Sequence, residues 1–254
     1  MTAIELLLLV VAGLGAGLAG SISGLASLVS YPALLAVGLG PVAANVTNTV
    51  ALVFSAVGST LGSRVELQGQ APRVRELGLA AVLGGGTGAT LLLLTPSDTF
   101  ELIAPWLIGV ASLTILMPPK VRPAASAGDE PRAAGAGLTG GVFLVAVYGG
   151  YFGAAAGVML LALLLAGTGD TLARSNALKN FVLGIANAVA AVGFCLLGPV
   201  HWGAVAPLAV GLFAGARIGP IVVRRANAGV LRVLIGVVGL AVAVKLGVDA
   251  YANA

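Results

Sequence analysis

Charged residues are scarce in this sequence. Asp, Glu, Lys and Arg make up 9% of its 254 residues, while 59% are hydrophobic and the mean hydropathy is +1.08. Soluble domains carry about 25% charged residues, so this composition excludes a chain whose surface faces water throughout. The apolar runs are long and rich in Leu, Ala, Val and Gly, which favours helices over the short alternating strands of a barrel. We therefore expect an all-α, polytopic protein of the plasma (inner) membrane, embedded in the lipid bilayer.

Reactive side chains are scarce as well. The single cysteine, Cys195, excludes an internal disulfide and a cysteine metal cluster, and the single histidine, His201, makes a poor proton relay. The sequence has no G-x-x-x-x-G-K-[ST] phosphate loop, which argues against ATP as the direct energy source. The basic residues lie in short breaks between apolar runs, a pattern that reports membrane topology. We expect no enzymatic activity, no cofactor, no metal site and no nucleic-acid partner.

The apolar runs fall into two classes by length. Two of them, 4–39 and 137–167, are glycine-rich and too long for one crossing. At about 1.5 Å per residue, half of either run is too short for a full crossing, so both runs predict short or re-entrant helix hairpins. The remaining runs are near the ~20 residues needed to cross a bilayer: 43–62, 77–95, 103–118, 173–198, 203–222 and 230–250.

Basic residues gather in the breaks at 63–76, 119–135 and 223–229. The positive-inside rule places these breaks on the cytoplasmic side. Counting membrane crossings from these basic breaks predicts that the hairpin at 4–39 opens to the outside and that the hairpin at 137–167 opens to the cytoplasm.

The two halves of the chain share an order of features. "GLAGSISGLASLVSYPALLAVGLGPVAANVTN" can be laid over "YGGYFGAAAGVMLLALLLAGTGDTLARSNALKN", which puts Ser27 on Gly157 and Thr47 near Asn176. We expect two inverted repeats, residues 1–118 and 136–254, joined by a cytoplasmic linker at 119–135. Each repeat is expected to be a glycine-rich hairpin followed by three transmembrane helices. Inverted repeats with broken helices are typical of secondary transporters, whose substrate site lies at the repeat interface near the midplane.

Several motifs resemble one known family. In the first half, Gly-x-x-Gly is followed by small residues, a proline and Ala-x-x-Thr; the second half has "GYFGAAAG", "NALKN" and the closing "GLFAGARIG". This pattern resembles the TauE/SafE family of sulfite and organosulfonate exporters over about residues 5–247. One departure is that Leu25, Ala26 and Ser27 stand where such proteins often carry a glycine triplet.

The resemblance implies an exporter of a small sulfur-containing anion, sulfite or an organosulfonate, that works by alternating access. A proton or sodium ion would be the coupling ion. A small-anion channel or uniporter, or a transporter of another organic anion, stays open as an alternative.

The hairpins supply one set of candidate anion-binding residues. The N-terminus of a half-helix carries free N–H groups and partial positive charge, and glycine lets a ligand approach the backbone closely. The alternative is that these small residues only permit tight helix crossing, which is also the expected role of "GGGTG" at 84–88. The hairpin candidates are Gly20, Ser21, Ser23, Gly24, Ser27, Gly150, Gly153 and Gly157.

A polar segment follows each hairpin: "ANVTNTV" at 44–50 and "ARSNALKN" at 173–180. Their amides and hydroxyls would hydrogen-bond sulfonate-like oxygens, and Arg174 and Lys179 would supply countercharge. N-capping and interfacial anchoring, above all by Arg174, are the alternative. Asn187, two turns beyond Asn180, is expected on the same face. The substrate-binding candidates from these segments are Asn45, Thr47, Asn48, Thr49, Arg174, Asn176, Lys179 and Asn180.

Overall fold

A computed structural model describes residues 1–116, 135–223 and 228–252, and all regular structure within those ranges is helical. The all-α prediction is therefore confirmed. The expected linker at 119–135 and most of the basic break at 223–229 lie outside the described residues.

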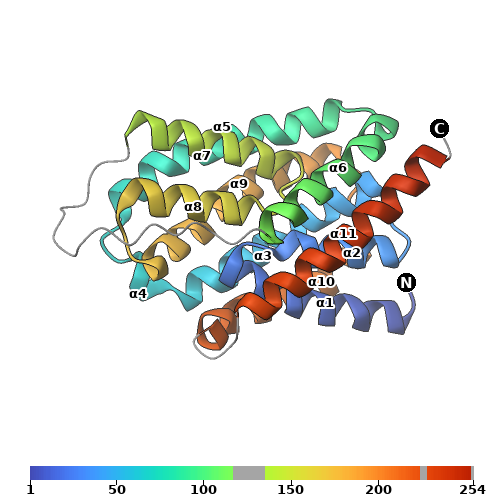
Figure 1. The fold of residues 1–254 in the computed structure, drawn as a ribbon, viewed down its shortest axis with the longest axis horizontal. Coiled ribbons are helices and arrows are strands. Elements are labelled where there is room, and N and C mark those ends of the chain that lie inside the picture. The colour runs from blue at the N-terminus through green and yellow to red at the C-terminus, as the bar shows by residue number, and fades with distance from the viewer. Residues whose placement is uncertain (117–134, 224–227, 253–254) are drawn as a thin grey trace.

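Eleven helices follow one another along the described chain (Figure 1). The first six are α1 (Ala3–Ser23), α2 (Ala26–Ala36), α3 (Pro41–Gly62), α4 (Arg64–Leu67), α5 (Ala71–Leu94) and α6 (Ser97–Leu116). The remaining five are α7 (Ala136–Tyr151), α8 (Ala156–Thr168), α9 (Leu172–Leu197), α10 (Trp202–Val223) and α11 (Ala228–Ala252). Among the described residues, five helices are long and apolar enough to cross a membrane: α1, α3, α5, α9 and α10.

Local sequence signals explain where several helices begin. Thr2 and Glu5 form a reciprocal capping box at the start of α1, which satisfies two of the free N–H groups of its first turn. Pro41 occupies the first turn of α3, where its missing N–H costs nothing. Thr171 accepts a hydrogen bond from the Arg174 N–H and so caps α9.

Helices α1 and α2 form one hairpin, and α7 and α8 form another. The first opens toward the end of the molecule that holds both termini, the second toward the end that holds α4 (Figure 1). The expected short helices are found in α2, α7 and α8, with 11, 16 and 13 residues. Helix α1 differs from that expectation, because its 21 residues are long enough to cross a membrane.

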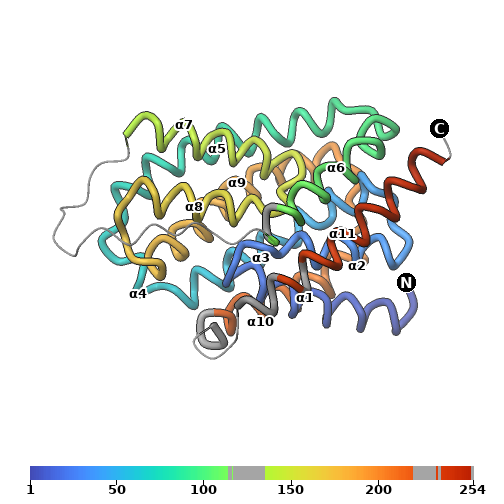
Figure 2. Tube along the Cα trace, viewed as in Figure 1, coloured from blue at the N-terminus to red at the C-terminus, as the bar shows by residue number. Residues whose placement is uncertain are grey.

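The tip of the α1–α2 hairpin contacts the tip of the α7–α8 hairpin near the middle of the molecule (Figure 2). Gly24 ends α1 with φ of +74°, and its N–H returns to the carbonyls of Ala19 and Gly20, which is the left-handed cap that glycine adopts without strain. A Cβ placed on Gly24 would lie 2.4 Å from the Gly157 Cα, and one on Gly157 would lie 2.3 Å from the Gly24 Cα. Any side chain at either position would therefore push the hairpins apart.

Glycine also brings long helices into close contact. A Cβ on Gly215 of α10 would lie 2.1 Å from the Leu14 carbonyl oxygen of α1, and a Cβ on Gly88 of α5 would lie 2.1 Å from the Val147 carbonyl oxygen of α7. Backbones that approach this closely require small residues at the crossing. The packing role predicted for the segment 84–88 is therefore confirmed.

Candidate functional site

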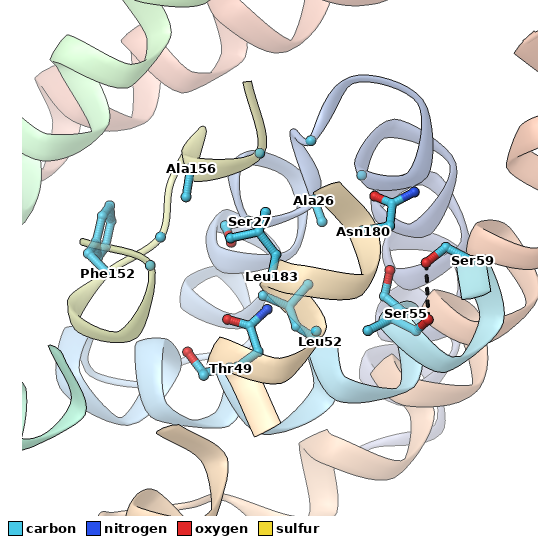
Figure 3. Close-up of a pocket in the computed structure, with 18 residues that line it drawn as sticks. Ala26, Ser27, Thr49, Leu52, Ser55, Ser59, Phe152, Ala156, Asn180 and Leu183 are labelled. Atoms are coloured by element: carbon cyan, nitrogen blue, oxygen red, sulfur yellow. Dashed lines mark hydrogen bonds between the residues drawn. The ribbon is translucent and has the colours of Figure 1, made fainter. Parts of the chain in front are cut away.

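A cavity of about 60 Å³ lies where the two hairpin tips meet α3 and α9 (Figure 3). Its walls come from four segments that are far apart in the sequence. They are the turn between α1 and α2, the middle of α3, the turn between α7 and α8, and the first half of α9.

The N-terminal ends of α2 and α8 both lie at this cavity. Ala26 and Ser27 belong to the first turn of α2, Ala156 and Gly157 to the first turn of α8, and all four residues line the cavity. Neither helix has a side-chain cap. The first N–H groups of a helix have no intrahelical partner and carry partial positive charge, so the tips together create an environment that suits an anion.

Hydroxyl and amide groups make up the polar part of the wall. Helix α3 contributes Thr49, Ser55 and Ser59, and helix α9 contributes Asn180 and Asn187. Together with the wall residues Leu52 and Leu183, they recur at three- to four-residue spacing, which places them along one face of each helix. None of the residues that line the cavity carries a charged side chain. Recognition there would rest on hydrogen bonds and helix ends.

Seven of the predicted site residues line the cavity. Figure 3 shows Ser27, Thr49 and Asn180 around it, contributed by α2, α3 and α9. The complete set is Gly20, Gly24, Ser27, Thr49, Gly153, Gly157 and Asn180. Asn187 shares the cavity with Asn180, as the two-turn spacing predicted.

Three predicted residues of α9 bind the end of α1. Asn176 donates to the Ser21 carbonyl at 2.8 Å, and Asn180 donates to the same oxygen at 3.3 Å. The Lys179 ammonium donates to the Gly20 carbonyl at 3.2 Å and to Asn176 Oδ1 at 2.8 Å. The last carbonyls of a helix lack intrahelical donors and carry partial negative charge. A cation and two amides therefore stabilise the broken end of α1.

Lys179 is fully buried. Its hydrogen-bond partners are a backbone carbonyl and an amide oxygen, and no carboxylate of the described residues forms a salt bridge with it. A buried charge without a counter-ion is costly, so this ammonium favours a negative charge nearby. Its neighbour in the chain, Asn180, lines the cavity.

Asn45 and Asn48 play a related part in the first half. Asn45 donates to the Tyr151 carbonyl at 2.8 Å, at the end of α7. Asn48 donates to Ser27 Oγ at 3.3 Å and accepts from Ser30 Oγ at 2.5 Å. Both amides are buried and lie behind the cavity wall, where they hold the hairpins in place.

The other predicted residues lie outside the cavity wall. Thr47 accepts a hydrogen bond from the His201 N–H at 3.0 Å, and Ser21 donates to the Leu18 carbonyl at 3.1 Å. Gly150 packs against the backbone of Gly85, where an added Cβ would lie 2.4 Å from its oxygen. Ser23 is half-buried at the end of α1.

Arg174 is found at the end of the molecule that holds α4. It forms an ion pair with Asp170, which also pairs with Arg73 of α5. Arg174 additionally donates to the Gln68 carbonyl at 3.3 Å, and Gln70 donates to the Arg174 carbonyl at 3.3 Å. These contacts tie the segment 66–73 to the segment 168–174.

Sequence reasoning missed Ser55, Ser59 and Phe152. Ser55 and Ser59 continue the helical face that begins at Thr49, so extending that face by about three turns would have found them. Phe152 gave no such signal, because its position follows from the contact of α7 with α2 and α6.

A second, larger cavity of about 760 Å³ lies between α2, α6 and α11. Its lining is largely apolar, with Asp98, Glu101, Asp249 and Lys245. The excess of carboxylates disfavours an anion, so this cavity is not the candidate site.

The chain was also compared with known proteins. A family model described as "Sulfite exporter TauE/SafE" matches residues 9–246. The chain is 29% identical over 247 residues to "Probable membrane transporter protein YfcA" of Escherichia coli K12, covering 93% of this chain and 87% of that protein. It is also 29% identical over 254 residues to "Probable membrane transporter protein ORF9" of Sinorhizobium sp, covering 95% and 92%. No solved structure matches the chain significantly.

Proposed function

The chain belongs to the sulfite exporter TauE/SafE family of membrane transporters, and from that premise we propose that it exports small sulfur-containing anions across the plasma membrane as a secondary transporter. A proton or sodium ion would be the coupling ion. The cavity at the hairpin tips is the proposed binding site.

One observation carries this proposal: two uncapped helix N-termini, those of α2 and α8, converge on one cavity. The N–H groups of Ala26 and Ser27 in α2 and of Gly157 in α8 offer donors from both hairpins to the oxygens of an anion. Ser55 and Asn180 add side-chain donors from α3 and α9, whereas the Thr49 hydroxyl already donates to the Asn45 carbonyl at 3.0 Å. The buried Lys179 ammonium lies behind the wall and adds long-range positive potential, which is strong in a medium of low dielectric.

Helix contacts support an arrangement of two inverted repeats. The proposed correspondence pairs the α1–α2 hairpin with the α7–α8 hairpin, α3 with α9, α5 with α10, and α6 with α11. The contacts then come in matched sets: α1 packs on α10 as α7 packs on α5, and α3 packs on α10 as α9 packs on α5. Matching the starts of α2 (Ala26) and α8 (Ala156) pairs Ser27 with Gly157, the match of the sequence overlay. Gly24 and Gly153 then lie at similar places in the two turns, with φ of +74° and +75°.

Alternating access follows from this arrangement in the proposal. The cavity lies between hairpins that open toward opposite ends (Figure 1). Rocking of residues 1–118 against residues 136–254 would expose a site between them to one side and then the other.

Flux into proteoliposomes tests the proposal. The purified protein should carry radiolabelled sulfite with a rate that saturates. Asn180→Ala and Asn187→Ala should each raise the sulfite concentration that gives half-maximal flux roughly 10- to 150-fold, because a hydrogen bond to a charged group is worth about 1.5–3 kcal/mol. Thr90→Ala is the matched control, since Thr90 is exposed on α5, away from the cavity.

Two results would count against the proposal. A flux that rises linearly with sulfite concentration would indicate a channel. If the sulfite concentration at half-maximal flux were unchanged in both asparagine variants, the anion site would lie elsewhere.

A further inference from the structure

Two asparagines bind the ends of the two hairpin helices in the same way. Asn176 donates to the Ser21 carbonyl of α1, and Asn45 donates to the Tyr151 carbonyl of α7, both at 2.8 Å. The two acceptors correspond as well, because matching the starts of α2 and α8 pairs Ser21 with Tyr151. Asn45 is therefore the counterpart of Asn176, a pairing that differs by two positions from the sequence overlay, which put Thr47 near Asn176.

This pairing places a lysine of one half opposite an asparagine of the other. Three residues beyond the paired asparagines, α9 carries Lys179 and α3 carries Asn48. The Lys179 ammonium donates to the Gly20 carbonyl at 3.2 Å, so a positive charge lies at the C-terminal end of α1, where the helix dipole favours it. The uncharged Asn48 amide binds Ser27 and Ser30 instead. Among the described residues, no ammonium hydrogen-bonds to the end of α7.

Backbone oxygens at the end of α7 lack donors. The N–H groups of the two residues after α7 both return to the Tyr148 carbonyl. The Gly149 and Gly150 carbonyls then accept no hydrogen bond from any residue that the structure describes, although both glycines are buried. Gly150 is the counterpart of Gly20, whose carbonyl accepts from the lysine.

The Asn45 side chain brings a further oxygen to the same helix end. Its Nδ2 binds the Tyr151 carbonyl, the last of α7. Its Oδ1 is buried and has no hydrogen-bond partner among the described residues. A buried polar atom without a partner costs about 1–3 kcal/mol. Oxygens without donors therefore occur on both sides of the contact between Asn45 and α7.

The chemistry of these oxygens selects the ligand. They belong to carbonyl and amide groups, which do not titrate near neutral pH but do bind hard metal cations. The set contains no carboxylate, so a buried divalent ion would keep most of its charge uncompensated. That favours a monovalent ion. The C-terminal ends of broken helices coordinate sodium in other transporters built from inverted repeats.

We propose that the C-terminal end of α7 and Asn45 Oδ1 bind a monovalent metal cation, which takes the place that the Lys179 ammonium holds at the end of α1. Gly149 also lines the anion cavity, so the bound cation attracts an anion there through a medium of low dielectric. By linkage, each ion raises the affinity for the other. The role of this cation as coupling ion rests on the proposed function, whereas its binding is measurable without transport.

Thermal unfolding in detergent, without any added sulfite, tests binding of sodium as the probe. Sodium chloride should raise the melting temperature of wild-type protein by about 2–4 °C over choline chloride of equal concentration, once sodium exceeds its dissociation constant about fivefold. Asn176→Ala is the matched control for Asn45→Ala, because each change removes a buried amide donor from the end of a hairpin helix. Only Asn45→Ala should lose the rise. If Asn45→Ala does not fold, Asn45→Asp keeps an oxygen, adds negative charge and should respond at lower sodium concentrations.

Sulfite flux into proteoliposomes tests the linkage. Replacing choline with sodium should lower the sulfite concentration at half-maximal flux about 5- to 150-fold in wild-type protein, and this sodium effect should be absent in Asn45→Ala.

The possible failures are distinct. Equal melting temperatures of wild-type protein in the two salts would overturn the cation site, and so would an equal sodium rise in Asn45→Ala and Asn176→Ala. Saturable sulfite flux that does not respond to sodium would overturn the linkage and leave anion transport intact. A sodium rise that Asn45→Ala abolishes, without sulfite flux from folded wild-type protein, would support the cation site and refute the proposed function.

Discussion

Asn45 and Asn176 each supply a hydrogen-bond donor to a backbone carbonyl where a hairpin helix ends. Each donates its amide to a carbonyl at the end of a hairpin helix, Tyr151 of α7 and Ser21 of α1 respectively. In a membrane such carbonyls have no water to bond, and an unsatisfied group costs several kcal/mol. These amides let the chain end a helix inside the protein.

We therefore expect Asn45→Ala and Asn176→Ala to lower stability. Each change leaves a buried carbonyl without a principal donor, which costs about 1–3 kcal/mol. Thermal unfolding in detergent without any anion measures this loss. Asn187→Ala is the contrast, because the Asn187 side chain lines the cavity and forms no hydrogen bond with the described residues. Equal melting temperatures for all three variants would contradict the capping role.

The same residues mark how far sequence reasoning reached at the site. Polar residues after each hairpin were predictable as candidates, because polar groups in apolar runs need a reason. The sequence did not predict which of these residues line the cavity and which support the hairpins from behind its wall. Whether Lys179 meets the cavity or the Gly20 carbonyl depends on how α9 crosses the end of α1, a contact between residues far apart in the chain.

At the scale of helices, glycine decides where long helices touch. Gly88 on α5 and Gly215 on α10 each face a carbonyl oxygen of α7 or α1 at a distance that leaves no room for a methyl group. Both glycines are the sixth residue of a similar small-residue segment, "LGGGTGA" at 83–89 and "VGLFAGA" at 210–216. Helix lengths were less predictable: the run 4–39 predicted two short helices, and the position of Gly24 instead gives one long and one short helix.

Two glycines of α5 allow a matched test of this packing. A Cβ on Gly88 would lie 2.1 Å from the Val147 oxygen, whereas a Cβ on Gly86 would meet only the Val189 side chain at 3.6 Å. Gly88→Ala should cost about 1–3 kcal/mol through overpacking. Gly86→Ala should be neutral or stabilise by about 0.4–1 kcal/mol. Thermal unfolding of the two variants in detergent measures the difference, and equal stabilities would contradict the close crossing.

At the scale of the whole molecule, charge is distributed unequally between the two ends. Arg64, Arg73 and Arg75 lie near α4, at the end where α7 begins and α10 finishes (Figure 1). Glu5 and Asp98 lie near the starts of α1 and α6, at the end that holds both termini. The same polarity was evident in the sequence, because charged residues mark the ends of apolar runs.

Polar contacts also join the two halves at the α4 end. Arg73 of the first half forms an ion pair with Asp170 of the second, and Arg174 of the second half donates to the Gln68 carbonyl of the first. This cluster of contacts links the two halves at that end, while the hairpin tips carry the proposed site deeper in the molecule. In an alternating cycle this cluster would have to separate when the α4 end opens.

The orientation of the molecule follows from the positive-inside rule, which places the α4 end in the cytoplasm. Two exposed positions test it in a Cys195→Ser background: Gln68, beside α4, and Gly40, at the turn between α2 and α3. A Cβ on Gly40 meets nothing within 4 Å and its φ is −64°, so cysteine fits there. In intact cells an impermeant thiol reagent should label Gly40→Cys and leave Gln68→Cys unlabelled until the membrane is permeabilised. The reverse pattern would mean that the hairpin α1–α2 opens to the cytoplasm.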